Sequence, residues 1–360
     1  MRSPSMGAVE DSFSAHFHLS RLGRKPDDAL PVEGLRMSHA FEHRPVMVEQ
    51  VVELLAPVPD GTVIDATVGG GGHARAVLEA HPHLRVLALD RDPAAVAAAS
   101  ATLLPFGPRA TVVRDRFDRL ADVAAEHGLT SASGVLFDLG VSSAQLDIPA
   151  RGFSYRHAAP LDMRMDPGEP TTAADLANTM TAADLAALFA RNGEGRFARR
   201  LARSVVAARP LSTTTQLAEV VRDAIPAPAR RQGGHPARRV FQALRIEVNQ
   251  ELLLLPRALD EALALLAPLG RCLVLSYHSG EDRIVKQRFA AEAARVCTCP
   301  PGMPCTCGAP ARARLVQRKP LRPAPEEVAT NRRAESARLR VIERAADATA
   351  TAGARTGPNA

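Results

Sequence analysis

The chain has few aromatic residues and no long apolar run. Its 360 residues include no Trp and two Tyr, and aromatic residues make up 4% of the sequence. Hydrophobic residues make up 46%, so the chain can bury a sizeable core, which must be mostly aliphatic. No segment approaches the roughly 20 apolar residues of a membrane span, and residues 1–36 lack the apolar centre of a signal peptide. These absences exclude a membrane-spanning protein and predict a cytoplasmic one.

Cysteine is scarce and unevenly placed. Four of the five Cys are packed together as Cys297-Thr-Cys299 and Cys305-Thr-Cys307. A reducing compartment makes structural disulfides unexpected there. Four thiolates could close a zinc site, although the C-x-C spacing is less usual than C-x-x-C. A zinc site and a reduced surface loop both stay open, and we include no metal in the predicted site.

Acidic residues are slightly outnumbered by basic ones. Lys and Arg total 45 against 39 Asp and Glu, a formal net charge of +6. A mild positive excess favours a polyanionic partner such as RNA or DNA, but many basic proteins bind no nucleic acid. Charge alone therefore leaves the partner open.

Strands and helices alternate in the first part of the chain. Val63-Ile-Asp-Ala66 predicts a short buried strand. Further strands are expected at 84–90, 110–113 and 134–138, with helices at 73–80, 93–101 and 117–127. Such alternation predicts an α/β fold with a parallel, doubly wound sheet.

The alternation stops in the middle of the chain. There, Thr172-Ala-Ala-Asp175 and Thr181-Ala-Ala-Asp184 are helix-start signals, because a Thr three residues before an acid can form a capping box. The α/β pattern then returns with a helix at 249–267 and strands at 271–277 and 315–318. We expect one α/β domain formed by 39–145 and 249–346, a helical insert at 146–248, a disordered arm at 1–38 and a disordered tail at 347–360. Met37 is a candidate start residue.

A glycine run at 69–72 joins the first strand to the first helix. Glycines there let the backbone approach a ligand, and the helix N-terminus offers free N–H groups. Asp90 ends the second strand, where a carboxylate can accept hydrogen bonds from both hydroxyls of a ribose. The pattern Gly69-x-Gly71-x-x-Ala74 also satisfies a dinucleotide fingerprint, so a nicotinamide cofactor and S-adenosylmethionine both fit the run alone.

Two further acids favour S-adenosylmethionine. Asp65, just before the glycine run, can reach a sulfonium cation but would repel a pyrophosphate. Asp138 ends the fourth strand, beside the expected nucleotide crevice. Enzymes that methylate nucleobase amino groups carry Asp or Asn, two prolines and an aromatic here, whereas this chain has Asp138-Leu-Gly-Val141. The acid is kept, and the aromatic stacking element is not.

Ordered motifs along the chain resemble the MraW/RsmH family, the bacterial 16S ribosomal RNA (cytosine-N4)-methyltransferases. The most specific is Leu161-Asp-Met-Arg-Met-Asp166. The family pattern Phe-His-Ser-Leu-Glu-Asp appears at 277–282 with Tyr277 and Gly280 at its two variable points. The resemblance covers about 40–290 and 315–343, through the stretches 43–47, 65–73, 89–93, 137–147, 151–154, 160–167, 193–198, 235–236, 241–246, 276–279 and 281–286.

The resemblance implies a class I methyltransferase sheet of the Rossmann-like kind and a set of site residues. By position, Gly71, Gly72 and His73 would line the methionine and ribose side of S-adenosylmethionine, Asp90 would hold the ribose, Phe117 would pack on the adenine, and Asp138 and Gln145 would complete the pocket. The implied reaction is methyl transfer to the exocyclic nitrogen of a cytosine in the decoding region of 16S rRNA. Asp138 is the candidate catalytic residue, with a purely cofactor-binding role equally open.

Arginines in the helical insert suggest a surface for RNA. Arg196, Arg199, Arg200 and Arg203 recur at helical spacing, and Arg230, Arg231, Arg238 and Arg239 flank a Gly-Gly pair. A solvated basic face is the alternative interpretation. His278, at the end of a strand, is either structural or in contact with the substrate.

Other functions explain less of the sequence. A nicotinamide dehydrogenase would account for the glycine run only, and a non-catalytic RNA-binding protein would not account for Asp65, Asp90 and Asp138 at successive strand ends. Methylation of DNA or protein stays open. The expected partner is 16S rRNA or the small ribosomal subunit, with no membrane, and a homodimer is compatible with the sequence.

Overall fold

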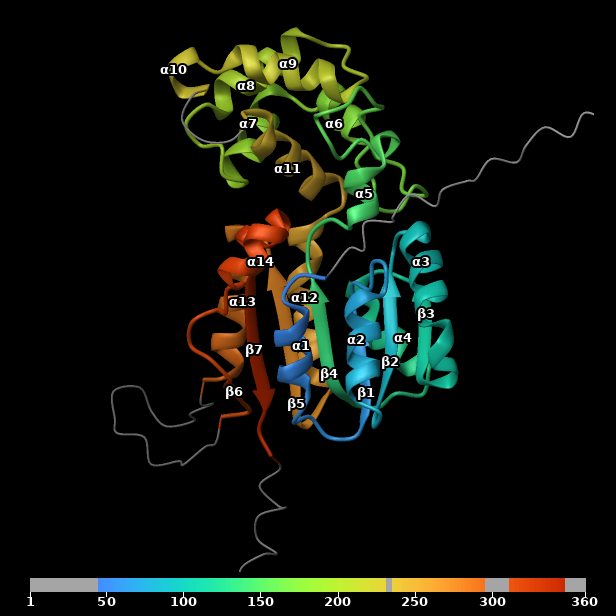
Figure 1. Cartoon of the computed structure of the whole chain (residues 1–360). Coiled ribbons are helices and arrows are strands. Elements are labelled where there is room, and N and C mark those ends of the chain that lie inside the picture. Colours follow the sequence, from blue (N-terminus) through green and yellow to red (C-terminus); the bar gives the residue numbers. More distant parts are fainter. Residues whose placement is uncertain (1–44, 231–234, 295–310, 347–360) are drawn as a thin grey trace, which may run out of the picture. The chain divides into compact units, whose positions relative to one another are not determined.

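The computed structural model describes residues 45–230, 235–294 and 311–346 (Figure 1). The expected arm at 1–38, the tail at 347–360, Arg231 and the four clustered cysteines from Cys297 to Cys307 lie outside the described residues.

A seven-stranded sheet with the order β3-β2-β1-β4-β5-β7-β6 forms the centre of the α/β part. The α/β class is confirmed. Strands β1 to β5 are parallel, and β7 runs antiparallel to both β5 and β6. The strands are β1 (Gly61–Asp65), β2 (Leu84–Asp90), β3 (Ala110–Arg114), β4 (Ala132–Asp138), β5 (Leu266–Ser276), β6 (Ala313–Leu315) and β7 (Arg338–Arg344).

Strand β7 adds an antiparallel strand that the sequence did not predict to the parallel strands that it did. The sequence analysis did not predict it, because the charged residues of Arg338-Leu-Arg-Val-Ile-Glu-Arg344 obscure its apolar positions. In the structure Arg338 and Arg340 donate to the carboxylate of Asp282 at 2.8 and 2.7 Å. This pairing offsets the charges of the two arginines, so they are tolerated on a strand whose Leu339, Val341 and Ile342 are buried.

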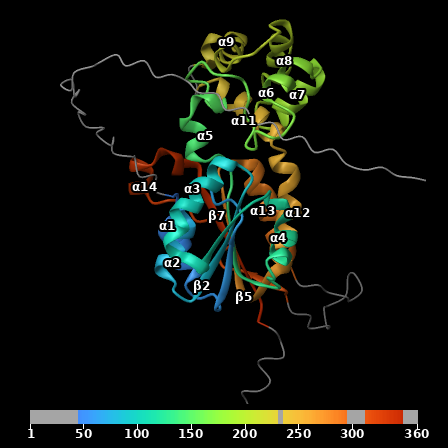
Figure 2. The same cartoon turned by 90° about the vertical axis from the view of Figure 1, so that its right-hand side faces the viewer.

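Helices cover both faces of the sheet, as Figure 2 shows in a view along its edge. One apolar cluster joins the sheet to α1 (Val48–Leu55), α2 (Gly72–Ala80) and α3 (Pro93–Leu103). A second cluster joins the other face to α4 (Leu120–Glu126), α12 (Glu251–Leu265) and α13 (Ser279–Glu292). Both layers are mostly aliphatic, as the composition predicts.

The stretch from 143 to 248 is helical and contains no named strand among its described residues. Its helices are α5 (Ser143–Asp147), α6 (Ala173–Thr179), α7 (Ala182–Arg191), α8 (Ala198–Ala207), α9 (Thr214–Ala224), α10 (Ala227–Arg230) and α11 (Ala237–Val248). Both expected caps are present, since the side chains of Thr172 and Thr181 accept hydrogen bonds from the N–H groups of Asp175 and Asp184 at 3.1 Å.

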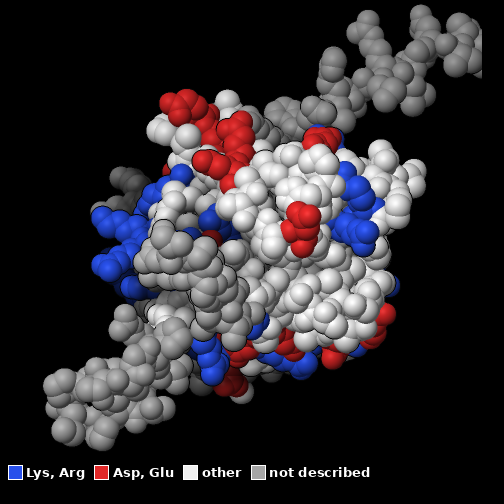
Figure 3. Space-filling model, turned by 90° about the horizontal axis from the view of Figure 1, so that it is seen from below, with Lys and Arg blue, Asp and Glu red and all other residues white. Residues whose placement is uncertain are grey.

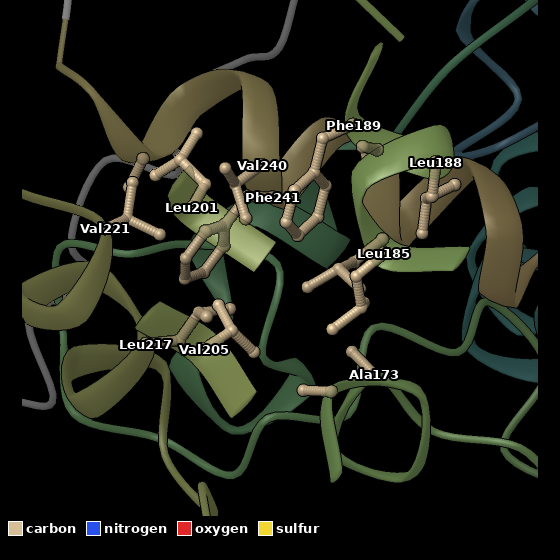
Figure 4. Packing of buried hydrophobic residues seen from close by; sticks show 14 of the residues in the cluster. Ala173, Leu185, Leu188, Phe189, Leu201, Val205, Leu217, Val221, Val240 and Phe241 are labelled. Atoms are coloured by element: carbon tan, nitrogen blue, oxygen red, sulfur yellow. The ribbon is translucent and has the colours of Figure 1, made fainter. Parts of the chain in front are cut away.

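The helical stretch has its own hydrophobic core, separate from the two sheet layers. Figure 4 shows Phe189 of α7, Leu201 of α8 and Val240 of α11 among the side chains that meet in it. A division of the chain at 146 and 248 stays a prediction, but this separate core is what a helical insert requires.

The family-specific run at 161–167 is joined to the sheet through Asn249. The amide of Asn249 accepts from the N–H of Met165 and donates to the carbonyl of Met163, both at 2.8 Å. Arg91, directly after β2, donates to the carbonyl of Asn249 at 3.0 Å. The run is therefore attached at the carboxyl edge of the sheet, beside Asp90.

Candidate active site

Three acids meet at the carboxyl edge of the parallel strands. Asp65 ends β1, Asp90 ends β2 and Asp138 ends β4. Strand β1 lies between β2 and β4 and pairs with both of them. Parallel strands bring their carboxyl ends to one edge, which is where α/β proteins bind ligands. The structure thus brings together the three carboxylates that the sequence singled out.

The glycine run turns tightly between β1 and α2. The N–H of Gly69 donates to Oδ2 of Asp90 at 2.9 Å, so the turn is fastened to the next strand. Gly71 has a φ of 83°, and a Cβ there would lie 3.3 Å from the Cα of Ala99. A Cβ on Gly72 would lie only 2.4 Å from Cγ of Pro45. Gly71 and Gly72 are therefore required by the local packing, whether or not a ligand is bound.

Asp65 and Asp90 titrate far above the usual range of a carboxyl group. Burial raises the pKa of Asp65 to about 7, with His73 opposing the rise and the charges of Asp138 and Asp90 adding to it. Burial also raises the pKa of Asp90 to about 6, although the N–H groups of Asp92 and Gly69 oppose this. Clustered, desolvated carboxyls of this kind are stabilised in their ionised form by a cation.

Asp138 lies in a chain of polar contacts at the end of β4. Its N–H donates to Oγ1 of Thr67 at 2.6 Å, and its Oδ1 accepts from the hydroxyl of Tyr277 at 2.6 Å. Nδ1 of His73 lies 3.6 Å from Oδ2 of Asp138. The other ring nitrogen of His73 donates to the carbonyl of Val46 at 2.9 Å, since a carbonyl only accepts.

The two other expected site residues, Phe117 before Asp138 and Gln145 after it, differ in their contacts. Phe117 begins the 3₁₀ turn Phe117–Arg119 after β3, and its ring meets that of Phe137 edge-on at 6.3 Å. Gln145 is buried, and its amide donates to Oδ2 of Asp92 at 2.9 Å and accepts from the N–H of Ser142 at 3.0 Å. Gln145 therefore braces α5 against the start of α3, and its expected role in a cofactor pocket stays a prediction.

Asp92, which the sequence did not single out, accepts hydrogen bonds from several segments at the edge of the site. Its carboxylate caps α3 through the N–H of Ala94 at 3.0 Å and also accepts from Arg151 at 2.9 Å. The same guanidinium of Arg151 donates to the carbonyls of Arg164 and Met165. Arg151 thus joins the motif around Arg164 to the edge of the site.

His278 caps a helix. Its Nδ1 accepts from the N–H of Gly280 at 3.2 Å at the start of α13, and its Nε2 lies 3.1 Å from Oε1 of Glu281. Of the two interpretations of His278, these contacts support the structural one. The residue of this motif that contacts Asp138 is its neighbour Tyr277, which the sequence analysis treated as a mild variation; its place directly after a strand was the available signal.

Two further properties of the described residues bear on function. Among them, no group of three or more His, Cys, Asp or Glu is arranged to hold a metal ion. No helix within the described ranges has the length and apolar character needed to cross a membrane.

The sequence matches a known protein family over most of its length. The model of the MraW methylase family matches residues 40–345, which confirms the resemblance seen in the motifs. A protein of Symbiobacterium thermophilum named Ribosomal RNA small subunit methyltransferase H is 52% identical over 308 residues, covering 84% of this chain and 96% of that protein. A protein of the same name from Acidothermus cellulolyticus is 51% identical over 321 residues, covering 87% and 97%.

A solved structure is more distantly similar. The crystal structure of an rRNA methylase from Streptococcus thermophilus aligns with 85% of this chain and 99% of its own, at 12% identity and a TM-score of 0.37. That score is too low to support an inference about this molecule.

Proposed function

Because the chain belongs to the MraW methylase family, we propose that it is an S-adenosylmethionine-dependent methyltransferase acting on the N4 amino group of a cytosine in 16S rRNA. We place that cytosine in the decoding region and the reaction in the cytoplasm, where small subunits are assembled. The observation that carries the proposal is the group of carboxyls Asp65, Asp90 and Asp138 around a glycine turn, of which Asp65 is buried and the other two are partly buried.

The donor set suits S-adenosylmethionine. When bound, this cofactor supplies a methyl group on a sulfonium, which passes to the attacking nitrogen as the S–C bond breaks and leaves a neutral thioether. Asp65 and Asp138 would face its cationic end. The methionine and ribose side would be lined by Gly71, Gly72 and His73, and Asp90 would accept hydrogen bonds from the ribose hydroxyls. Phe117 would pack on the adenine, and Gln145 would border the pocket. The loop after β3 is tied to β2 by a hydrogen bond from the N–H of Asp115 to the carbonyl of Asp90 at 3.1 Å, which supports a shared adenosine site for Asp90 and Phe117.

A nicotinamide dinucleotide suits the same edge less well. Its pyrophosphate would have to approach the glycine turn beside Asp65, where burial already opposes negative charge and raises the pKa of that carboxyl to about 7. The acids therefore favour a cationic over an anionic ligand.

The acceptor amino group needs a hydrogen-bond acceptor from the protein. The lone pair of an exocyclic cytosine nitrogen is delocalised into the ring, and accepting hydrogen bonds from its protons localises it. Asp138 and the carbonyl groups that follow it are the candidates, since they border the same edge as the glycine turn. Positioning would supply most of the remaining acceleration, and the surplus proton of the methylated nitrogen would pass to Asp138 or to water.

The helical stretch supports an RNA substrate. Arg199, Arg200 and Arg203 of α8 are exposed, while Leu201 and Val205 of the same helix are buried. The guanidinium of Arg196 lies over the ring of Phe197, 5.0 Å from its centre. Figure 3 shows the molecule from below, where patches of Lys and Arg lie beside patches of Asp and Glu, whereas α8 carries basic residues and no acid. Phosphate groups are the natural counterpart of such surfaces.

The second group of arginines, around Arg238 and Arg239, is less available for phosphate contact. Arg239 pairs with the buried carboxylate of Glu194 at 3.2 Å, which removes part of its charge from the surface, while Arg238 is exposed. The arginines of α8 are therefore the stronger candidates for phosphate contact.

The proposal is tested by incubating the protein with methyl-labelled S-adenosylmethionine and 30S subunits, naked 16S rRNA or 50S subunits, and then mapping the modified base. We expect label on the N4 of one cytosine of 16S rRNA and none on 50S subunits. Label on DNA or protein, or a measured affinity for NAD without one for S-adenosylmethionine, would sink the proposal. Asp122, an exposed acid of α4, offers a control: Asp122→Ala should retain activity that Asp138→Ala loses.

A further inference from the structure

Tyr277 makes two contacts with the segment proposed to accept the substrate's amino protons. Its hydroxyl donates to Oδ1 of Asp138 at 2.6 Å. Its ring lies against the following turn, where a Cβ on Gly140 would be 3.5 Å from Cδ2 of Tyr277. One side chain thus bonds to the carboxylate and also leaves room for no more than a Cβ at the position two residues beyond it.

The backbone of Tyr277 is itself held from behind. Its N–H donates to Oε2 of Glu281 at 2.8 Å, and Glu281 is buried in the first turn of α13. Burial works against ionisation of Glu281, but the hydrogen bond from His278, the charge of Arg245 and the hydrogen bond from the N–H of Tyr277 outweigh it and lower the pKa of that carboxyl. His278 and Glu281 therefore form an anchor that fixes where the tyrosine ring lies.

The hydroxyl of Tyr277 remains a donor at all physiological pH values. Burial, and next the negative charge of Asp138, raise the pKa of Tyr277 well above its ordinary value. This donor on Oδ1, at 2.6 Å, holds the carboxylate of Asp138 in one orientation, and Nδ1 of His73 lies 3.6 Å from the other carboxylate oxygen.

We infer that Tyr277 is a positioning residue that orients Asp138 to accept a hydrogen bond from the amino group of the target base. This inference rests on the proposed function, because the amino group is the acceptor named there. A tyrosine in this role acts on the rate of methyl transfer. It does not contribute to the binding of the RNA, whose candidate surface is on α8, or to the adenosine site beside Asp90.

The experiment compares Tyr277→Phe with Tyr155→Phe. The chain has two tyrosines, so the second is a matched control. The ring of Tyr155 stacks on His235 at 4.5 Å within the helical stretch, and the change to Phe keeps that ring. We expect Tyr277→Phe to lower the single-turnover rate with 30S subunits about tenfold, as the loss of one hydrogen bond to a charged group would do, and Tyr155→Phe to leave it unchanged.

Three further measurements separate positioning from a structural role. The KM for RNA, the Kd for S-adenosylhomocysteine and the thermal midpoint of Tyr277→Phe should stay close to those of the wild type. In the background of Asp138→Ala, adding Tyr277→Phe should cause less than a twofold further loss, since residues that act through one another are not additive. A full tenfold loss in that background would overturn the inference.

The outcomes for the inference and for the proposed function are distinct. An N4-methylated product formed at the wild-type rate by Tyr277→Phe would overturn the inference alone. A tenfold loss of affinity for S-adenosylhomocysteine in the same variant would assign the hydroxyl to cofactor binding and overturn it as well. A wild-type product methylated at a carbon or ring nitrogen would contradict the proposed function and, with it, the role given to Tyr277.

Discussion

The carboxyl edge of the sheet and the helical stretch use polar residues in opposite ways. The edge buries Asp65, His73 and Asp92 within one small region. Between 143 and 248, the buried polar or charged residues among those described are Gln145, Glu194 and Thr214. The helical stretch keeps most of its charges on the surface and packs an apolar core, whereas the sheet edge collects charges where water is scarce.

This difference indicates that the carboxyl edge and the helical stretch contribute differently to stability and to function. Buried carboxyls with raised pKa values make the edge costly to form, and two packed helical layers hold it in place. The helices need no such support, because apolar contacts hold them together and α6, α7 and α9 each begin at a side-chain cap. A change at the edge should therefore alter binding and chemistry, while a change on the helices should alter RNA affinity or stability only.

The largest effect is expected from reversing charge on α8 and on Arg196, which directly precedes its N-cap. The triple change Arg196→Glu, Arg199→Glu and Arg203→Glu should raise the KM for RNA by about 10- to 100-fold and lower the salt dependence of binding by about three units of slope, because each phosphate contact releases counterions. Filter binding and steady-state methylation across a salt series measure both.

Affinity for S-adenosylmethionine should not change in that variant. Arg85→Glu, at an exposed position near the amino end of β2, is a control for a single reversal such as Arg199→Glu. Unchanged methylation of RNA by the triple variant would show that the α8 arginines are only a solvated face, and the contrast between the two regions would lose its functional meaning.

The second prediction concerns pH and the carboxyl edge. Asp65 and Asp90 ionise as the pH rises through about 7 and about 6, so negative charge appears at the site and a cation should bind more tightly at higher pH. Affinity for S-adenosylmethionine should rise about tenfold between roughly pH 5.5 and pH 7.5, measured by calorimetry.

S-adenosylhomocysteine is the matched ligand, because it lacks the sulfonium charge. Its affinity should rise less over the same range, and Asp65→Asn should flatten the difference between the two ligands. Equal pH dependence for both would mean that the acids do not recognise the sulfonium.

The smallest effect is expected from removing one helix cap. Thr172→Ala deletes the side chain that accepts from the N–H of Asp175, and should lower the free energy of unfolding by about 1 kcal/mol in urea titrations. Thr171→Ala, at the neighbouring position, controls for the loss of a threonine side chain. A change in kcat for folded Thr172→Ala would show that the helical stretch is not separable from the chemistry.

Much of the site could be predicted because it depends on local pattern. Asp65, Asp90 and Asp138 each end a buried strand, and strand ends in a parallel sheet meet at one edge whatever the rest of the chain does. The caps at Thr172 and Thr181 likewise need only residues three positions apart. These predictions required no knowledge of long-range packing.

The contacts that could not be predicted join residues that are far apart in the sequence. Gln145 and Arg151 meet at Asp92, more than fifty positions away, so an amide expected beside the cofactor is found bracing a helix start. Strand β7 was missed because its arginines are neutralised by Asp282 on α13, a pairing that no local pattern reveals.

The sequence by itself determined the α/β alternation, the acids at the strand ends and the family, because spacing and residue type carry that information directly. Only the tertiary structure decided that β7 is antiparallel, that His278 caps a helix and that Tyr277 contacts Asp138. Those outcomes depend on which side chains are brought within a few ångströms of one another, as the hydroxyl of Tyr277 and the carboxylate of Asp138 are. The same packing buries Asp65 and so raises its pKa.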